Sequence, residues 1–126
     1  NSITPDFTVS AATTAYNTGV WTTGNEVSGT GWAAGGPALS AAGSGNTSTA
    51  PTVTQSPSGT LMWDMNDVVQ TGCTFSNAYG CLIYANALTP KIGLIAVPFG
   101  SGYSPSAGTF TIQWATAGVA TIDLTP

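Results

Sequence analysis

Few residues of this chain could do chemistry, and the first group of them lies in a glycine-rich stretch. Gly29-Thr30-Gly31-Trp32-Ala33-Ala34 matches the G-x-G-x-x-A pattern of dinucleotide-binding proteins. That pattern binds a cofactor when it opens a helix and when an acid about 20 residues further on holds the ribose. No acid lies between Glu26 and Asp64, and Gly35-Gly36-Pro37 opposes a helix. We therefore interpret the stretch as a glycine-rich β-turn region and predict no cofactor.

A second group of oxygen-bearing side chains lies at Asp64-Met65-Asn66-Asp67. Asp64, Asn66 and Asp67 would form a weak cation site if further oxygens joined them, because Ca²⁺ takes about six to eight oxygen ligands. Two carboxylates could also perform the acid–base steps of glycoside hydrolysis. Asx turns between two strands explain the same residues with neither ligand nor catalysis, and we favour this interpretation.

The two cysteines, Cys73 and Cys81, are predicted to be free thiols. The segment Cys73–Tyr84 is rich in aromatic, β-branched and apolar residues and is predicted to form one long strand. Such a strand holds the two cysteine Cα atoms about 26 Å apart, at about 3.3 Å per residue, whereas a disulfide needs less than about 7 Å. A tight hairpin near Asn77 is the alternative that would permit a bridge. With no His and no third Cys, the chain lacks the ligands of a zinc site.

No residue is predicted to be catalytic, since the chain contains no His, no Arg and no G-x-S-x-G motif to activate a serine. The four tryptophans are the remaining candidates for a binding site. A tryptophan on the surface anchors an interface or stacks on a ligand, whereas a buried one belongs to a core. Trp21 and Trp32 are the candidate interface or glycan-contact residues, and a glycan-binding module stays open as an alternative.

The composition excludes several classes of protein. Lys91 is the only basic residue against five acids, which gives a net charge of −4 and a charged fraction of 5%. Nucleic acid is excluded as a partner, because its binding needs several cations to displace counterions. A membrane is not expected either, because no stretch approaches the about 18–20 consecutive apolar residues of a span. Thr, Ser, Ala and Gly supply 66 of the 126 residues. A surface of such residues repels its neighbours weakly and suits a subunit of an assembly.

The elements that must position these residues are strands. Gly and Pro recur throughout, and no window of a dozen residues keeps an apolar stripe of helical period. In the first half we expect a strand at Phe7–Ser10 and a hairpin over Trp21–Trp32. In the second half the expected strands are a buried Leu61–Trp63, then Cys73–Tyr84, Ile92–Phe99, Thr109–Trp114 and Val119–Leu124. A loop at Asn86–Lys91 is expected to join Cys73–Tyr84 and Ile92–Phe99 as a hairpin.

The chain is therefore predicted to be all-β, with residues 1–126 forming a single β-sandwich domain of jelly-roll type. Residues 40–60 are nearly all Ser, Gly, Thr, Ala and Pro, which predicts an extended excursion between strands, held by a neighbouring subunit. The period-2 pattern of Thr109–Trp114 places its three large apolar residues on one face. The residues expected in the core are Phe75, Leu82, Tyr84, Ile95, Phe110, Ile112 and Trp114.

Four segments resemble a pattern of small virion structural proteins of tailed bacteriophages. They are Asn25–Gly36 (NEVSGTGWAAGG), Thr74–Tyr84 (TFSNAYGCLIY), Ile92–Gly100 (IGLIAVPFG) and Ser106–Trp114 (SAGTFTIQW). Together they contain 41 of the 126 residues, about a third of the chain. The chain is similar to this family in a strand that ends in an apolar pair and Tyr, a strand that ends in Phe-Gly, and a Gly-Thr-Phe-Thr-Ile strand.

The resemblance implies a non-enzymatic component of a virus particle. It implies a capsid decoration or cement protein, located on the outer surface of the virion and bound to the major capsid protein and to copies of itself. A trimer at a capsid symmetry axis is the arrangement expected from where decoration proteins commonly sit. The alternatives are a tail-associated structural protein and a glycan-binding β-sandwich module.

Overall fold

Seven strands and no helix make up the described part of the chain in the computed structural model, which covers residues 26–43, 45, 49–56, 59–88 and 91–124. The strands are β1 (Thr52–Ser56), β2 (Thr60–Asp64), β3 (Val68–Cys73), β4 (Ala78–Ala85), β5 (Ile92–Tyr103), β6 (Gly108–Ile112) and β7 (Ala120–Asp123). The all-β prediction is confirmed for these residues. The strand expected at Phe7–Ser10 and most of the hairpin expected at Trp21–Trp32 lie outside them.

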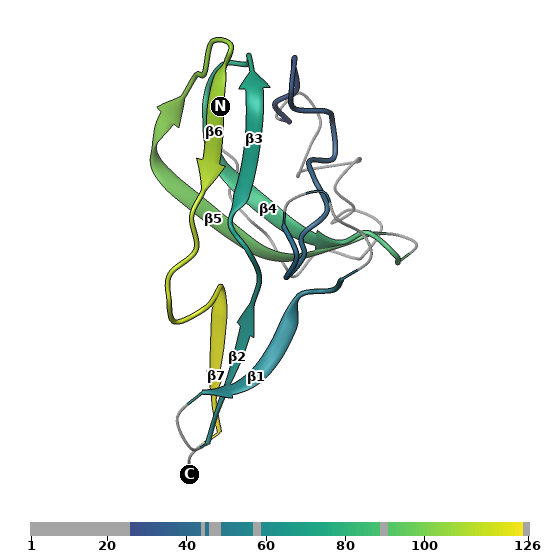
Figure 1. The fold of residues 1–126 in the computed structure, drawn as a ribbon, viewed down its shortest axis with the longest axis vertical. Helices are drawn as coiled ribbons and strands as arrows, with labels where there is room; N and C mark the ends of the chain where they lie inside the picture. Colours follow the sequence, from purple (N-terminus) through teal and green to yellow (C-terminus); the bar gives the residue numbers. More distant parts are fainter. Residues whose placement is uncertain (1–25, 44, 46–48, 57–58, 89–90, 125–126) are drawn as a thin grey trace.

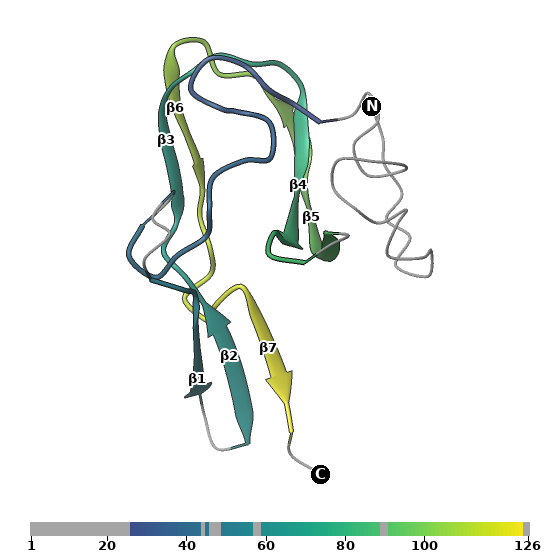
Figure 2. The ribbon, with the colours of Figure 1, turned by 90° about the vertical axis from the view of Figure 1, so that its right-hand side faces the viewer.

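The described strands pair antiparallel in three small sheets. β1, β2 and β7 form a three-stranded sheet, β3 pairs with β6, and β4 pairs with β5. Figure 1 shows β2 leading into β3 and β6 returning to β7, so that the three-stranded sheet extends from one end of the β3–β6 pair. Figure 2 shows the β4–β5 hairpin opposite the β3–β6 pair, with the dark-blue segment that begins at residue 26 between them.

The predicted continuous strand Cys73–Tyr84 is wrong. β3 ends at Cys73 and β4 begins at Ala78, because the chain crosses there from one strand pair to the other. Asn77 has a φ of 62°, a left-handed conformation that Asn adopts more readily than most residues. Its backbone N–H donates a hydrogen bond to Ser104 Oγ at 3.0 Å. This bond holds the crossing against the loop that joins β5 to β6.

Other strands of the second half lie close to their predicted positions. The expected Ile92–Phe99 lies within β5, Thr109–Trp114 overlaps β6, and Val119–Leu124 contains β7. β4 and β5 are paired as the hairpin that was expected there.

The Leu61–Trp63 segment is confirmed as a strand, since it lies within β2, but it is not buried. The side chain of Leu61 is 37% exposed, and that of Trp63 is half-buried. The segment at residues 40–60, predicted to be an excursion, contains the whole of β1, so part of this polar tract belongs to a sheet.

The core lies between the β3–β6 and β4–β5 pairs. The buried cluster consists of Cys73, Phe75, Ala78 and Phe110, and Val27, Trp32, Phe99 and Ile112 pack against it. The ring centroid of Phe110 lies 5.1 Å from Phe75, 5.4 Å from Trp32 and 6.2 Å from Phe99, in edge-to-face contacts. Each contact of this kind contributes about 0.5–1.5 kcal/mol beyond the area it buries. One aromatic ring thus joins three other segments of the chain.

The predicted core residues divide into two groups. Phe75 and Phe110 are buried. The half-buried members are Leu82, Tyr84, Ile95, Ile112 and Trp114. The alternation predicted for β6 is confirmed, because its Phe and Ile are covered while the two threonines between and before them are exposed. Met65, Val68 and Ile83 are buried residues that the pattern missed.

Candidate interaction surface

The glycine-rich stretch forms a tight turn against the end of β3. Gly29 and Trp32 exchange two backbone hydrogen bonds, with N···O distances of 2.9 and 3.1 Å. Gly31 has a φ of 72°, and a Cβ at that position would lie only 2.8 Å from the backbone oxygen of Gly72. The glycines therefore permit close contact between two backbone segments. The described residues that follow the turn form no helix, which agrees with the β-turn interpretation.

Trp32 lines a shallow pocket of about 350 Å³. The other lining residues are Gly29, Gly31, Ala33, Gly36, Pro37 and Gln70. The indole is half-buried, because it also packs edge to face on Phe75 and Phe110, with centroids 5.9 and 5.4 Å away. Trp32 therefore packs on the core with part of its indole and contributes the rest to the surface. Trp21 lies outside the described residues, so its proposed contact stays a prediction.

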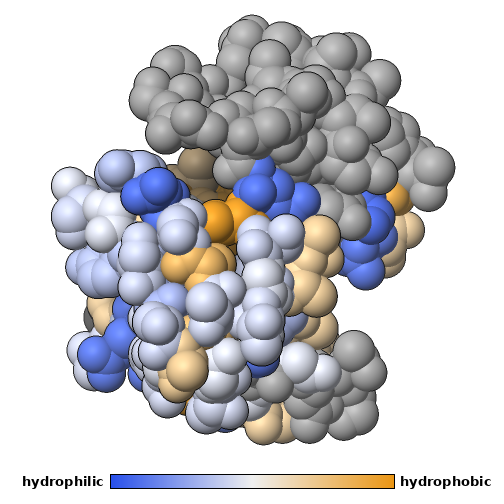
Figure 3. Space-filling model, turned by 90° about the horizontal axis from the view of Figure 1, so that it is seen from above, coloured by the Kyte–Doolittle hydropathy of each residue, from blue (hydrophilic) through white to orange (hydrophobic). Residues whose placement is uncertain are grey.

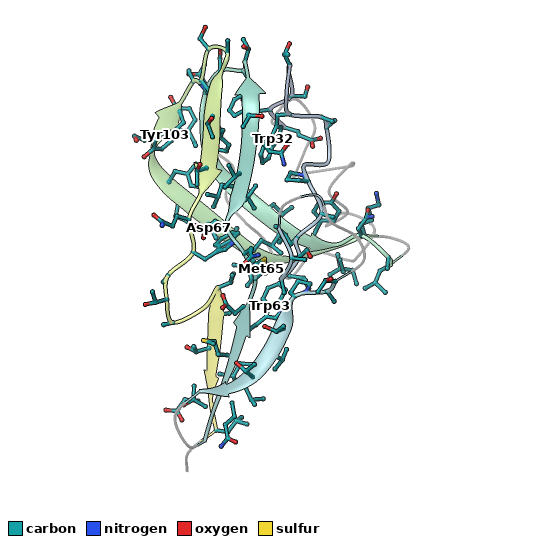
Figure 4. The ribbon with its side chains drawn as sticks, viewed as in Figure 1. Trp32, Trp63, Met65, Asp67 and Tyr103 are labelled. Atoms are coloured by element: carbon teal, nitrogen blue, oxygen red, sulfur yellow. The ribbon has the colours of Figure 1, made fainter. Side chains whose placement is uncertain are left out.

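The oxygen-bearing group Asp64–Asp67 lies where the three-stranded sheet meets the strands above it (Figure 4). Asp67 Oδ1 accepts a hydrogen bond from the Trp114 backbone N–H at 2.9 Å. The indole N–H of Trp114 donates to Asn66 O at 3.2 Å, and the Asn66 N–H donates to Ser40 O at 3.0 Å. The two Trp114 bonds join the chain that enters β3 to the chain that leaves β6, and the third bond joins Ser40 to the same segment, which is a structural role.

The weak cation site predicted at Asp64, Asn66 and Asp67 gains no further ligands from the described part of the chain. There, no group of three or more His, Cys, Asp or Glu side chains is placed to hold a metal. One oxygen of Asp67 already accepts a backbone hydrogen bond. The cation site stays a prediction, and the turn interpretation accounts for the hydrogen bonds.

Cys73 and Cys81 are free thiols, as predicted, although the continuous strand used in that argument does not exist. Cys73 is fully buried, and its thiol lies 3.5 Å from Gly31 O and 3.4 Å from Gln70 O. Cys81 is half-buried in β4, and burial raises the pKa of its thiol to about 11. A thiol with so high a pKa carries little thiolate at neutral pH and is a poor nucleophile there.

Large apolar side chains are exposed at several places on the described surface. They are Val53, Leu61, Val69, Tyr79, Leu88, Leu94, Tyr103, Ile122 and Leu124. Seen from above, the described surface is mostly weakly hydrophilic, with a small hydrophobic patch near its centre (Figure 3). Scattered apolar residues are normal on a protein, whereas a contiguous group marks an interaction surface. Four of the nine, Val53, Leu61, Ile122 and Leu124, belong to the β1–β2–β7 sheet or directly follow it.

This concentration of apolar residues in one sheet was not predicted from the sequence. The tract at residues 40–60 was interpreted by its average composition, so that Val53, the single apolar residue of β1, was given little weight. The signal that could have revealed the sheet is the alternation of polar and large apolar residues at 52–54 and 121–124, together with the apolar run at 61–63. Such a signal becomes specific only when the three segments are known to be neighbours.

No protein-family model matches the chain, and neither the curated proteins nor the solved structures contain a significant match. None of the described residues belongs to a helix long and apolar enough to span a membrane.

Proposed function

We propose that this chain is a non-enzymatic structural protein of a tailed-phage virion, namely a capsid decoration or cement protein on the outer surface of the particle. Its partners would be the major capsid protein and copies of itself, arranged as a trimer. The observation that carries the proposal is the exposure of nine large apolar side chains among the described residues of a chain whose charged fraction is only 5%. Such surfaces become buried when subunits assemble.

The residues available for chemistry support a structural role. The chain has no His or Arg to act as a base or an anion clamp, and its single Lys91 lies 5.8 Å from the ring centroid of Tyr84. The Asp67 carboxylate accepts a backbone hydrogen bond, and the Cys81 thiol has a raised pKa. These groups are better suited to holding the fold than to turning over a substrate.

We also propose that the β3–β6 and β4–β5 pairs are the two layers of a β-sandwich of jelly-roll type. Support comes from the aromatic contacts between the layers, in which Phe99 of β5 lies 6.2 Å from Phe110 of β6, measured between ring centroids. Sheets that pack face to face meet through such interdigitated side chains.

The alternatives are a tail-associated structural protein and a glycan-binding module. The observation that favours glycan binding is the pocket beside Trp32, whose half-buried indole is available to a ligand on one side. The extensive packing of that indole on Phe75 and Phe110 favours a structural role instead.

The experiment that tests the proposal adds the purified chain to phage particles that lack it and sediments the particles. Saturable co-sedimentation, together with greater resistance of the particles to heat, supports a decoration protein. A chain that stays in the supernatant and binds a polysaccharide, with Trp32→Ala abolishing that binding and Trp32→Phe preserving it, would establish the glycan-binding alternative.

A further inference from the structure

The β1–β2–β7 sheet has one apolar face and one polar face. Its register aligns Val53 with Trp63 and Ala120 in one row across the three strands, and Gln55 with Leu61 and Ile122 in the next. Residues that are directly opposite share a face, and successive residues of a strand alternate between faces. The apolar face therefore carries Val53, Gln55, Leu61, Trp63, Ala120 and Ile122. The opposite face carries Thr52, Thr54, Thr60, Met62, Asp64, Thr121 and Asp123.

The apolar face is exposed at several of its residues. Among the described strands, β2 pairs with β1 on one side and with β7 on the other, and none of the three pairs with a strand outside this sheet. Val53 is 64% exposed, Ile122 is 60% exposed and Leu61 is 37% exposed. Leu124, which continues the alternation just beyond β7, is 60% exposed. Figures 1 and 2 show the sheet projecting away from the strands above it. A sheet with one apolar face is stable when a second layer covers that face.

We propose that the covering layer is the same face of a second copy of this chain. Sheet-on-sheet packing at about 10 Å is the ordinary way to bury such a face. A face that packs on its own copy makes an isologous contact around a two-fold axis, so this interface joins the copies in pairs, and the contacts of a three-fold ring would use other surfaces. The inference deepens the proposed function, because it names the surface through which the copies meet.

The distribution of charge favours a second copy and identifies the face that it uses. The apolar face carries no charged residue, and Gln55 is its one strongly polar member. Two identical faces can therefore meet without bringing like charges together. The opposite face carries Asp64 and Asp123, so that a symmetric contact there would place carboxylates near one another and cost free energy. Pairing through the apolar face keeps both carboxylates outside the contact.

The size of the face sets the expected strength of the contact. Three strands about 4.8 Å apart and about five residues long give a face of about 14 by 16 Å. That is a plan area of about 220 Å² in each copy, so a pair packed on this face alone buries less than the about 1,000 Å² that a specific interface requires. A contact below this limit predicts dissociation weaker than micromolar. Many copies held on one particle would strengthen it through effective concentration.

The test measures the mass of the full-length chain by sedimentation equilibrium from about 1 μM to about 1 mM, a range that spans the affinity expected for a contact of this size. The disrupting variant is Val53→Thr/Ile122→Thr, which keeps β-branched residues in both strands and removes apolar surface. The matched control, Thr54→Val/Thr121→Val, makes the reverse change on the opposite face. Circular dichroism and thermal unfolding establish that each variant is folded.

We expect the wild type to associate reversibly and the disrupting variant to raise the dissociation constant at least about 10-fold, while the control leaves it unchanged. A wild type that stays monomeric at every concentration overturns the inference, as does a disrupting variant that associates like the wild type. A second outcome separates the interface from the function. If the wild type associates and the disrupting variant is monomeric, but the wild type never binds particles, the interface stands and the proposed function fails. If the disrupting variant forms normal oligomers and also decorates particles, the function stands and this interface fails.

Discussion

Replacing Phe110 by alanine removes the ring that joins the two strand pairs, and we expect a loss of about 3–5 kcal/mol in the free energy of unfolding. The ring is 8% exposed and makes edge-to-face contacts with Trp32, Phe75 and Phe99. The alanine variant loses the transfer free energy of the ring, leaves a cavity, and forfeits three aromatic contacts of about 0.5–1.5 kcal/mol each. Because domains of this size have a total stability of about 5–15 kcal/mol, the loss is a large part of the whole.

The assay is equilibrium unfolding in guanidinium chloride, followed by tryptophan fluorescence. The matched control is Thr111→Ala in the same strand, where the side chain is exposed and we expect a change below about 1 kcal/mol. Phe110→Leu keeps most of the volume and should cost about 1–2 kcal/mol, so it provides a measurable variant if the alanine variant does not fold. If Phe110→Ala costs no more than Thr111→Ala, the aromatic cluster is not the core of this protein.

Three further predictions concern single side chains. Alkylation of Cys81 at pH 8 should be about 100-fold slower in the folded than in the unfolded chain, because burial raises its pKa from 9.0 to about 11. The stability that the neutral thiol provides is present below pH 9 and should fall as the pH rises towards 11, a dependence that Cys81→Ala should weaken. Asp67→Ala should cost about 1–2 kcal/mol, because the Trp114 N–H loses its acceptor. Gly31→Ala should cost about 1–3 kcal/mol, since its φ of 72° and the nearby backbone oxygen of Gly72 oppose a side chain.

Each of these predictions has its own control or contrary result. Rapid alkylation of Cys81 in the folded chain at pH 8 would show that the thiol is accessible and ionised. The control for Asp67→Ala is Asp64→Ala, which should change the free energy of unfolding by less than about 1 kcal/mol. If Ca²⁺ raises the stability of the wild type and Asp67→Ala abolishes that rise, the result favours the cation site instead. Gly108→Ala is the control for Gly31→Ala, because the nearest atoms to an added Cβ lie 3.9 Å away and its φ is not positive. Equal losses at the two glycines would contradict the close contact at β3.

Local sequence patterns predicted much of the second half of the fold. The alternation in β6 and the apolar run of β5 specify strands directly, because the side-chain period of a strand is two residues. The boundary between β3 and β4 was missed, because residues 73–84 are uniformly rich in strand-forming types. The break depends on the left-handed conformation of Asn77 and on its bond to Ser104, a residue 27 positions away. A contact of that separation leaves no local pattern.

The candidate surfaces were predicted less well than the strands. Trp32 was predicted to be an interface or glycan-contact residue, which stays a prediction, and its packing on Phe75 and Phe110 depends on tertiary contacts that the sequence does not show. The apolar face of the β1–β2–β7 sheet was missed, because it forms only when β7 pairs with β2 across about 60 residues of chain. Val53 was visible as an isolated apolar residue, and its role depends on the register that places it beside Trp63.

The central claim, that this chain is a structural component of a virus particle, is tested most directly by counting its copies in purified particles. Quantitative mass spectrometry of particles purified by density gradient would compare the amount of this chain with that of the major capsid protein. We expect many copies per particle, in a fixed ratio that agrees with a symmetric arrangement. If the copies must associate in order to bind, particles assembled with the Val53→Thr/Ile122→Thr variant should lack them. Absence of the chain from purified particles, or a trace amount that varies between preparations, would contradict the central claim.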